Sequence, residues 1–187
     1  MTCMNLVITG NPGVGKHTIA KYIQNHDSTF EIIDINKFSM DEGLAEKDED
    51  NLEVDEELLK TKMKEKISSK SLIVGHLAPY VLDEPDVDLV IVLRKNPYDL
   101  FEIYKNRNYS DKKNKENTGS EILGIIANDS LSSFSLDKTY EIDTTNKNPK
   151  QIVEQIHEII EGRNNRDLVD WLSLVKEKYD FNRFFEY

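Results

Sequence analysis

Short apolar runs alternate with amphipathic stretches along the chain. Runs rich in β-branched residues and bounded by polar or turn residues predict strands, and five such runs cover residues 4–8, 29–35, 71–74, 87–93 and 139–143. Between them, apolar residues at helical spacing predict helices that begin near Ile19, Asp55, Pro97, Asn117, Pro149 and Trp171. This alternation predicts an α/β fold with a parallel sheet of about five strands and helices on both faces.

The pattern is interrupted by two charged segments. Between Asp41 and Glu57 many carboxylates surround few apolar residues, which is typical of an exposed connection rather than of core. The second segment is basic and contains Lys105, Arg107, Lys112, Lys113 and Lys115. A solvated surface and a lid that closes over polyphosphate would both have this composition, and both interpretations stay open.

Composition limits the class of protein. The 187 residues fit one domain with its own core. A formal net charge of −11 argues against nucleic-acid binding over the whole surface, but it allows a basic protein partner, or RNA at the basic segment. The chain has no run of about 18 apolar residues, and its first apolar stretch is too short for a signal peptide. We therefore expect a cytoplasmic protein without a membrane partner.

A glycine-rich loop between the first strand and the first helix carries the clearest chemistry. Its residues are Gly10, Asn11, Pro12, Gly13, Val14, Gly15, Lys16, His17 and Thr18. The spacing G-x-x-x-x-G-K between a strand and a helix is that of a P-loop, whose backbone N–H groups and lysine bind phosphate. The residue after the lysine is His17 rather than the Ser or Thr that ligates Mg²⁺, so Thr18 is the nearest hydroxyl for the metal.

Two further strands end on candidate site residues. The run at 71–74 stops at Gly75 and His76, and the run at 87–93 is followed by Arg94. Ligands of open α/β sheets bind at the carboxyl ends of the strands. We therefore expect His76 and Arg94 to lie near the P-loop, although a structural role for the histidine stays open.

With these motifs in hand, the chain resembles the adenylate kinase isoenzyme 6 family in its archaeal form, the broad-specificity nucleoside monophosphate kinases. The resemblance covers nearly the whole chain and rests most specifically on the block Arg107-Asn108-Tyr109-Ser110-Asp111-Lys112-Lys113 after Val92-Leu93-Arg94. It implies a three-layer P-loop kinase fold in a single domain, with a monophosphate-binding insertion over about residues 34–54 and a short lid over about residues 108–117.

The resemblance also implies an activity and partners. The family transfers the terminal phosphate of ATP to AMP with Mg²⁺, and it hydrolyses ATP. Members are linked to maturation of the small ribosomal subunit through a small-subunit ribosomal protein. Four residues depart from the family pattern. His17 stands where a Thr or Ser is usual, Val74 where a Walker B acid is usual, Asn108 where a glycine is usual and Ile103 where an arginine is usual.

The predicted catalytic residues are Lys16, Arg94, Arg107 and His76. Lys16 bridges the terminal phosphates, the two arginines stabilise the charge of the transferring group, and His76 orders a metal-bound water or the acceptor. Arg107 also binds ATP beside the loop, and the segment at 143–149 contacts the adenine. Three functions stay open: a kinase with ATPase activity, an ATP-gated assembly factor with vestigial kinase activity, and a scaffold without turnover.

Overall fold

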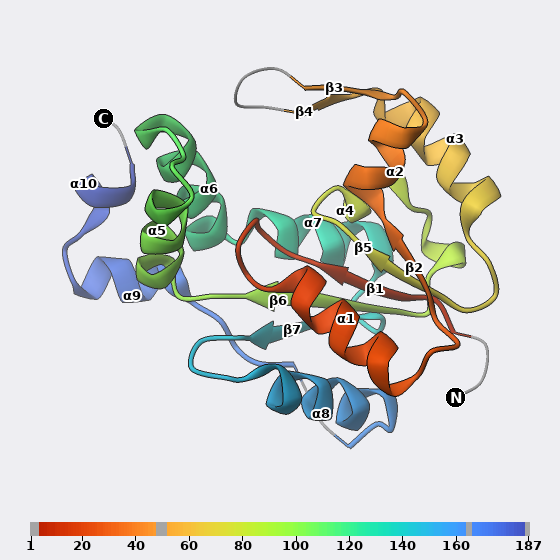
Figure 1. Cartoon of the computed structure of the whole chain (residues 1–187). Helices are drawn as coiled ribbons and strands as arrows, with labels where there is room; N and C mark the ends of the chain where they lie inside the picture. Colours follow the sequence, from red (N-terminus) through yellow and green to blue (C-terminus); the bar gives the residue numbers. More distant parts are fainter. Residues whose placement is uncertain (1–3, 48–51, 164–165, 186–187) are drawn as a thin grey trace.

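A five-stranded parallel sheet runs through the computed structural model, which describes residues 4–47, 52–163 and 166–185 (Figure 1). Its strands are β1 (Leu6–Thr9), β2 (Glu31–Asp34), β5 (Ser71–Val74), β6 (Leu89–Arg94) and β7 (Thr139–Asp143). They lie in the order β2-β5-β1-β6-β7, and every pairing is parallel. The predicted fold class is confirmed. The central strand β1 therefore leads its glycine loop out of the middle of the carboxyl edge.

Helices cover both faces of the sheet. One face packs against α1 (Lys16–His26), α5 (Pro97–Asn106) and α8 (Pro149–Ile160). The other face packs against α2 (Ile35–Asp41), α3 (Glu56–Lys66), α4 (Ala78–Val81) and α7 (Ile125–Phe134), with a 3₁₀ turn at Glu84–Asp86.

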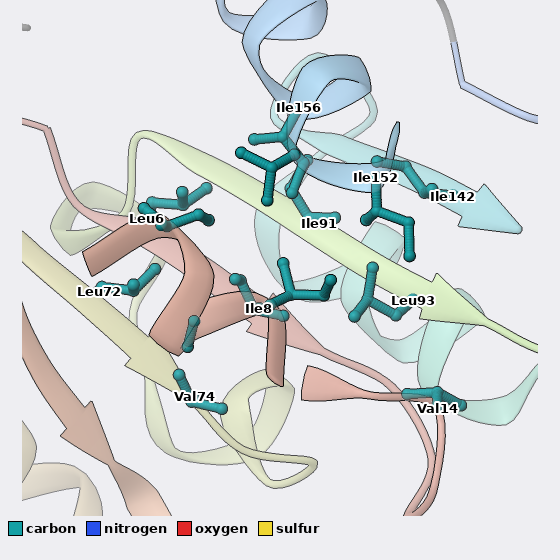
Figure 2. Packing of buried hydrophobic residues seen from close by; sticks show 14 of the residues in the cluster. Leu6, Ile8, Val14, Leu72, Val74, Ile91, Leu93, Ile142, Ile152 and Ile156 are labelled. Carbon is teal, nitrogen blue, oxygen red and sulfur yellow. The ribbon is translucent and has the colours of Figure 1, made fainter. Parts of the chain in front are cut away.

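Strand residues alternate between these two cores, as the twofold period of a strand requires. In β6, Ile91 and Leu93 belong to the first core, whereas Val90 and Val92 belong to the second. Figure 2 shows the first core, where the strand side chains meet Ile152 and Ile156 of α8. Burial on both faces explains why the three inner strands, β5, β1 and β6, are nearly continuous apolar runs.

A third, smaller core lies beyond the carboxyl edge of the sheet. There α6 (Asp111–Leu123), α9 (Trp171–Glu177) and α10 (Phe181–Phe184) pack together with α5 (Figure 1). Phe101, Ile122, Val175 and Phe184 are buried at its centre. The aromatic residues near the end of the chain thus pack on a core, while Tyr187 lies outside the described residues.

Two of the predicted element boundaries that differ from the structure bear on the site. The second strand ends at Asp34 rather than at residue 35, because the Asp34 carboxylate accepts a hydrogen bond from the Lys37 N–H and caps α2. The helix predicted from Asn117 begins at Asp111, where Ser110 is the N-cap. It ends at Gly124, which is left-handed (φ 65°) and separates α6 from α7. The predicted lid at 108–117 is therefore mostly the first two turns of α6.

The acidic segment is not simply a connection. It contains a two-stranded antiparallel hairpin of β3 (Ala45–Lys47) and β4 (Leu52–Val54). Leu44 and Val54 are partly buried against the second core. Part of the predicted monophosphate-binding insertion, residues 48–51, lies outside the described residues. None of the described helices has the length and apolar character needed to span a bilayer.

Candidate active site

The glycine loop has the backbone of an anion-binding nest. Gly10, Gly13 and Gly15 have φ angles of 128°, 86° and 105°, which L side chains rarely adopt. At Gly10 a Cβ would also lie 2.3 Å from the Leu93 carbonyl oxygen. Gly15 is the N-cap of α1 and gives it no side-chain hydrogen bond. The first N–H groups of α1, where the helix dipole is positive, are therefore left for an anion.

Lys16 is folded back onto the loop that precedes it. Its Nζ donates hydrogen bonds to the carbonyl oxygens of Gly10 at 2.8 Å and Asn11 at 2.9 Å. Burial lowers the pKa of Lys16 to about 8, although the negative charge of Glu121 opposes this shift. A buried cation that donates its hydrogen bonds to neutral carbonyls is suited to exchange them for phosphate oxygens.

A pocket of about 640 Å³ opens in front of the loop. Its walls come from the P-loop, the β2–α2 junction, the end of β5 and the segment from Arg107 into α6. The lining residues are Pro12, Gly13, Gly15, Lys16, His17, Thr18, Asp34, Asn36, Gly75, His76, Arg107, Tyr109, Lys113 and Asn117. The structure thus brings the predicted Lys16, His17, Thr18, His76 and Arg107 together around one space.

Asp34 supplies the carboxylate that the sequence lacks at Val74. The two residues are register partners on the neighbouring strands β2 and β5, so the carboxylate lies one strand away. His17 Nε2 is 2.6 Å from Asp34 Oδ2, and the His17 side chain is 60% exposed. The predicted site did not include Asp34. Its position at the carboxyl end of a predicted strand, the argument used for His76, could have identified it.

His76 lines the pocket as a neutral side chain. Burial, and secondarily the charge of Lys16, lower its pKa to about 4. At neutral pH the imidazole therefore both donates and accepts hydrogen bonds without adding charge.

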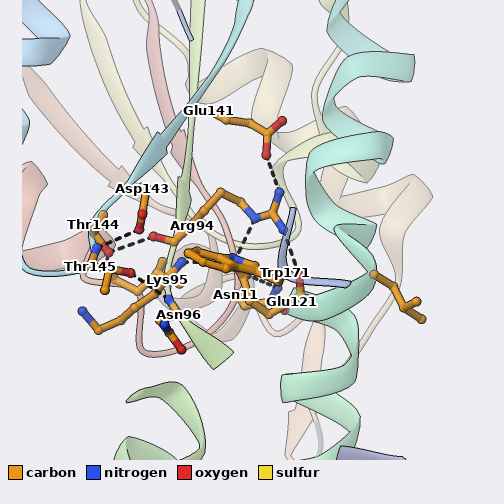
Figure 3. Close-up of polar contacts among 12 residues, drawn as sticks. Asn11, Arg94, Lys95, Asn96, Glu121, Glu141, Asp143, Thr144, Thr145 and Trp171 are labelled. Atoms are coloured by element: carbon orange, nitrogen blue, oxygen red, sulfur yellow. Dashed lines mark hydrogen bonds and ion pairs between the residues drawn. The ribbon is translucent and has the colours of Figure 1, made fainter. Parts of the chain in front are cut away.

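The prediction that Arg94 belongs to the site is wrong, because its side chain does not line the pocket. Arg94 is 4% exposed, and its Nε donates to Glu121 Oε1 at 2.8 Å while Nη1 is bonded to Glu141 (Figure 3). A guanidinium held by two carboxylates is not available to a phosphate. The sequence pattern missed this because Glu121 comes from a helix 27 residues further along the chain.

Three residues of the lid region line the pocket although they were not predicted individually: Tyr109, Lys113 and Asn117. Tyr109 stacks on Tyr104 at a centroid distance of 5.4 Å, and the Tyr104 hydroxyl donates to the Pro12 carbonyl at 2.6 Å. The beginning of the lid is therefore tied to the phosphate loop through one aromatic contact.

The segment at 143–149 packs beside the loop rather than lining the pocket. Thr144 Oγ1 donates to the Val14 carbonyl at 3.3 Å and to the Arg94 carbonyl at 2.9 Å. Contact of this segment with adenine stays a prediction.

The donor set around the loop is compatible with Mg²⁺, which prefers oxygen ligands and retains several waters. Asp34 and Thr18 bring a carboxylate and a hydroxyl to the pocket. Within the described ranges, no three His, Cys, Asp or Glu side chains are grouped to hold a metal by themselves. A metal here would therefore be held mainly by phosphate oxygens and water.

Comparison with known proteins agrees with this geometry. Residues 6–124 match the family model described as an AAA domain. A protein named "Putative adenylate kinase" from Thermococcus kodakarensis is 32% identical over 183 residues, which cover 96% of this chain and 99% of the relative. The protein of that name from Saccharolobus islandicus strain L.S.2.15 is 35% identical over 82% of this chain and 81% of its own. The chain belongs to this P-loop kinase family.

Solved structures show the same P-loop kinase fold. Thymidylate kinase from Candida albicans superimposes with a TM-score of 0.52 at 17% identity, over 90% of this chain and 95% of that enzyme. Shikimate kinase from Bacteroides thetaiotaomicron gives 0.50 at 16% identity, over 84% and 98%. At such identities the likeness concerns the fold alone.

Proposed function

We propose that this P-loop kinase is a nucleoside monophosphate kinase of the adenylate kinase type, which transfers the terminal phosphate of ATP to AMP and also hydrolyses ATP. The observation that carries the proposal is the single pocket that joins Lys16, Arg107 and the start of α2. Phosphoryl transfer requires donor, acceptor and cations to be positioned in one space. The names of the archaeal relatives support the same substrates.

In this mechanism the loop N–H groups and Lys16 bind the ATP phosphates. Lys16 leaves the carbonyls of Gly10 and Asn11 to reach the β- and γ-phosphates. Arg107, which follows the end of α5, neutralises charge on the transferring group, and loss of such a contact typically lowers the rate by about 10²- to 10³-fold. Lys113, in the first turn of α6, adds a second cation to that wall.

Mg²⁺ would supply charge neutralisation at the phosphates. Asp34 and Thr18 would hold its water ligands, and neutral His76 would orient a water or the acceptor phosphate. Oδ2 of Asp34 is already hydrogen-bonded to His17, so the water ligands of the metal would compete with His17 for the Asp34 carboxylate.

We assign binding of the monophosphate to the insertion at residues 34–54 and closure over ATP to the lid at 108–117. Asn36 at the start of α2 and Asn117 in α6 line the pocket from these two segments. The narrower assignment to isoenzyme 6 rests on the motif block that begins at Arg107.

A second candidate function is an ATP-gated assembly factor that binds a small-subunit ribosomal protein, with vestigial kinase activity. Two observations favour it. Val74 is fully buried and offers no oxygen to a metal, and Ile103 packs beneath Gly13 where a cation would face the phosphates. The net charge of −11 also suits a basic protein partner.

An assay of ADP production separates the candidates. Mg-ATP is incubated with and without AMP, and ADP and phosphate are followed. Two ADP per ATP with consumption of AMP supports the kinase, phosphate release independent of AMP supports the ATPase, and no turnover contradicts both. Lys16→Ala is expected to abolish either activity, whereas Lys21→Ala, on the exposed side of α1, is the matched control.

A further inference from the structure

A buried carboxylate outside the pocket connects the phosphate loop to the C-terminal helices. Glu121 in α6 is fully buried. Its Oε2 accepts a hydrogen bond from Asn11 Nδ2 at 2.8 Å. Its Oε1 accepts from Arg94 Nε at 2.8 Å, from the Lys95 N–H at 3.0 Å and from Trp171 Nε1 at 3.0 Å (Figure 3). The carboxylate is thus shared between four donors from different parts of the chain.

The Asn11 contact leads directly to the phosphate site. Asn11 is 3% exposed and is the second residue of the glycine loop. Its side chain donates to Glu121, while its carbonyl accepts the hydrogen bond of Lys16 Nζ. When Lys16 turns to phosphate it releases the Asn11 carbonyl, so the Asn11–Glu121 contact becomes a main restraint on this part of the loop.

The Trp171 contact leads to the opposite side. Trp171 is the first residue of α9 and is partly buried against the small core of Val175 and Phe184. Its indole N–H shares Oε1 of Glu121 with two other donors. A buried carboxylate that loses a donor is destabilised, and it relaxes toward the donors that are left.

Charge makes the carboxylate sensitive to such a loss. Arg94 is paired with both the buried Glu121 and the partly exposed Glu141, so this cluster contains one cation and two carboxylates. The hydrogen bonds donated by the Asn11 side chain and by the Trp171 indole stabilise the excess negative charge. Their effects on Glu121 therefore depend on each other.

We propose that Glu121 is a positioning residue that couples nucleotide binding at the phosphate loop to the seating of Trp171 and α9. The inference rests on the proposed nucleotide binding. It adds a second position that influences nucleotide binding, Trp171, which lies 50 residues from Glu121 along the chain. Because coupling is reciprocal, a ligand that moves α9 weakens nucleotide binding, and a bound nucleotide fixes α9.

The test uses Trp171 as its own probe, because it is the one tryptophan of the sequence. Saturating Mg-ADP should shift the emission of Trp171 in the full-length protein. In Asn11→Ala, at saturating Mg-ADP, the shift should fall to less than about half, because the connection to Glu121 is lost. An unchanged shift in Asn11→Ala would overturn the coupling.

Calorimetry supplies the second measurement. Trp171→Phe keeps an aromatic side chain in the core and removes the indole N–H, and it should weaken Mg-ADP binding about 3- to 10-fold. Leu172→Ala changes an exposed residue of α9 beside Trp171 without touching Glu121, and it should change binding less than about twofold. In the double variant Asn11→Ala/Trp171→Phe the loss should be smaller than the product of the single losses, whereas a simple product contradicts the proposal. If wild-type protein binds no Mg-ADP, the proposed function itself fails, and the two failures are distinguishable.

Discussion

At the scale of single residues, the two departures around the metal position are neighbours in space. His17 occupies the place of the metal-ligating hydroxyl, and its imidazole pairs with Asp34. Asp34 in turn is the register partner of Val74. The pocket therefore contains a carboxylate at the proposed metal position, but this carboxylate is engaged by His17, which stands where the hydroxyl is usual.

Replacing His17 tests this arrangement. His17→Thr restores a hydroxyl beside Lys16 and frees Asp34, so the Mg²⁺ concentration for half-maximal ADP formation should fall about tenfold. A Mg²⁺ titration at fixed ATP measures it. His26→Thr, at the far end of α1, is the matched control. An unchanged Mg²⁺ requirement in His17→Thr would show that residue 17 does not influence the metal.

The histidine at the end of β5 carries a prediction about acid stability. Its pKa is lowered by burial to about 4, whereas in the unfolded chain it is near 6.5. Between these values the unfolded state binds a proton that the folded state does not, so the free energy of unfolding falls as the pH falls.

His76→Gln should remove this part of the acid sensitivity. Between pH 7 and pH 4, wild type should lose on the order of 1–3 kcal/mol more than the variant, measured by urea unfolding. His157→Gln changes an exposed residue of α8 and should follow wild type. Parallel curves for wild type and His76→Gln would contradict a buried neutral histidine.

At the scale of elements, the site depends on how closely α2 approaches the end of β5. A Cβ on Gly75 would lie 2.8 Å from the Cβ of Ile35, the first residue of α2. The absence of a side chain at Gly75 therefore lets the β2–α2 junction, with Asp34 and Asn36, reach the pocket beside His76.

Gly75→Ala should push this junction outward. Overpacking at such a contact costs about 1–3 kcal/mol, and because Asn36 moves while the P-loop stays, KM for AMP should rise more than KM for ATP. Gly43→Ala, just past the other end of α2, is the control, since its Cβ meets nothing within 4 Å. Gly43 is left-handed (φ 69°) whereas Gly75 is not, so Gly43→Ala adds backbone strain to this region without a steric contact at the pocket. Equal effects on both KM values would argue against a role of α2 at the acceptor.

The strands and the P-loop were predictable because their signals are local. The inner strands are short apolar runs, the edge strands are short and contain β-branched residues, and the loop has fixed glycine spacing before a helix. The start of α6 was not predictable in this way. Its first turns hold Lys112, Lys113 and Lys115 without an apolar period, and only the cap at Ser110 marks the beginning.

The site shows the same division between local and long-range information. Lys16, His17 and Thr18 follow from one motif, whereas the placement of Arg94 depends on Glu121 and Glu141. An arginine at the end of a strand predicts a catalytic cation. The prediction is the same whether or not a distant helix supplies a carboxylate that pairs with the arginine. Such pairings are set by tertiary packing and leave no mark in the spacing of the sequence.

At the scale of the whole molecule, the pocket lies where separately anchored parts converge. The P-loop rests on the central sheet, Asn36 belongs to α2 above the second core, and Asn117 belongs to α6 beside the third core (Figure 1). A ligand that spans both substrate positions would contact all of them. A ligand confined to the ATP position would contact only the loop and the α6 side.

This difference predicts the response to a bisubstrate analogue of two adenosines joined by five phosphates. At 100 times its dissociation constant the analogue should add about 2.7 kcal/mol of stability and raise Tm by about 5–10 °C. Hydrogen exchange should slow in the first turn of α2 and in the first turns of α6. A non-hydrolysable ATP analogue alone should protect α6 and the loop but not α2, and Lys16→Ala should show neither pattern. Equal protection of α2 by the ATP analogue would mean that α2 is not the acceptor side, because protection would then require no ligand at that position.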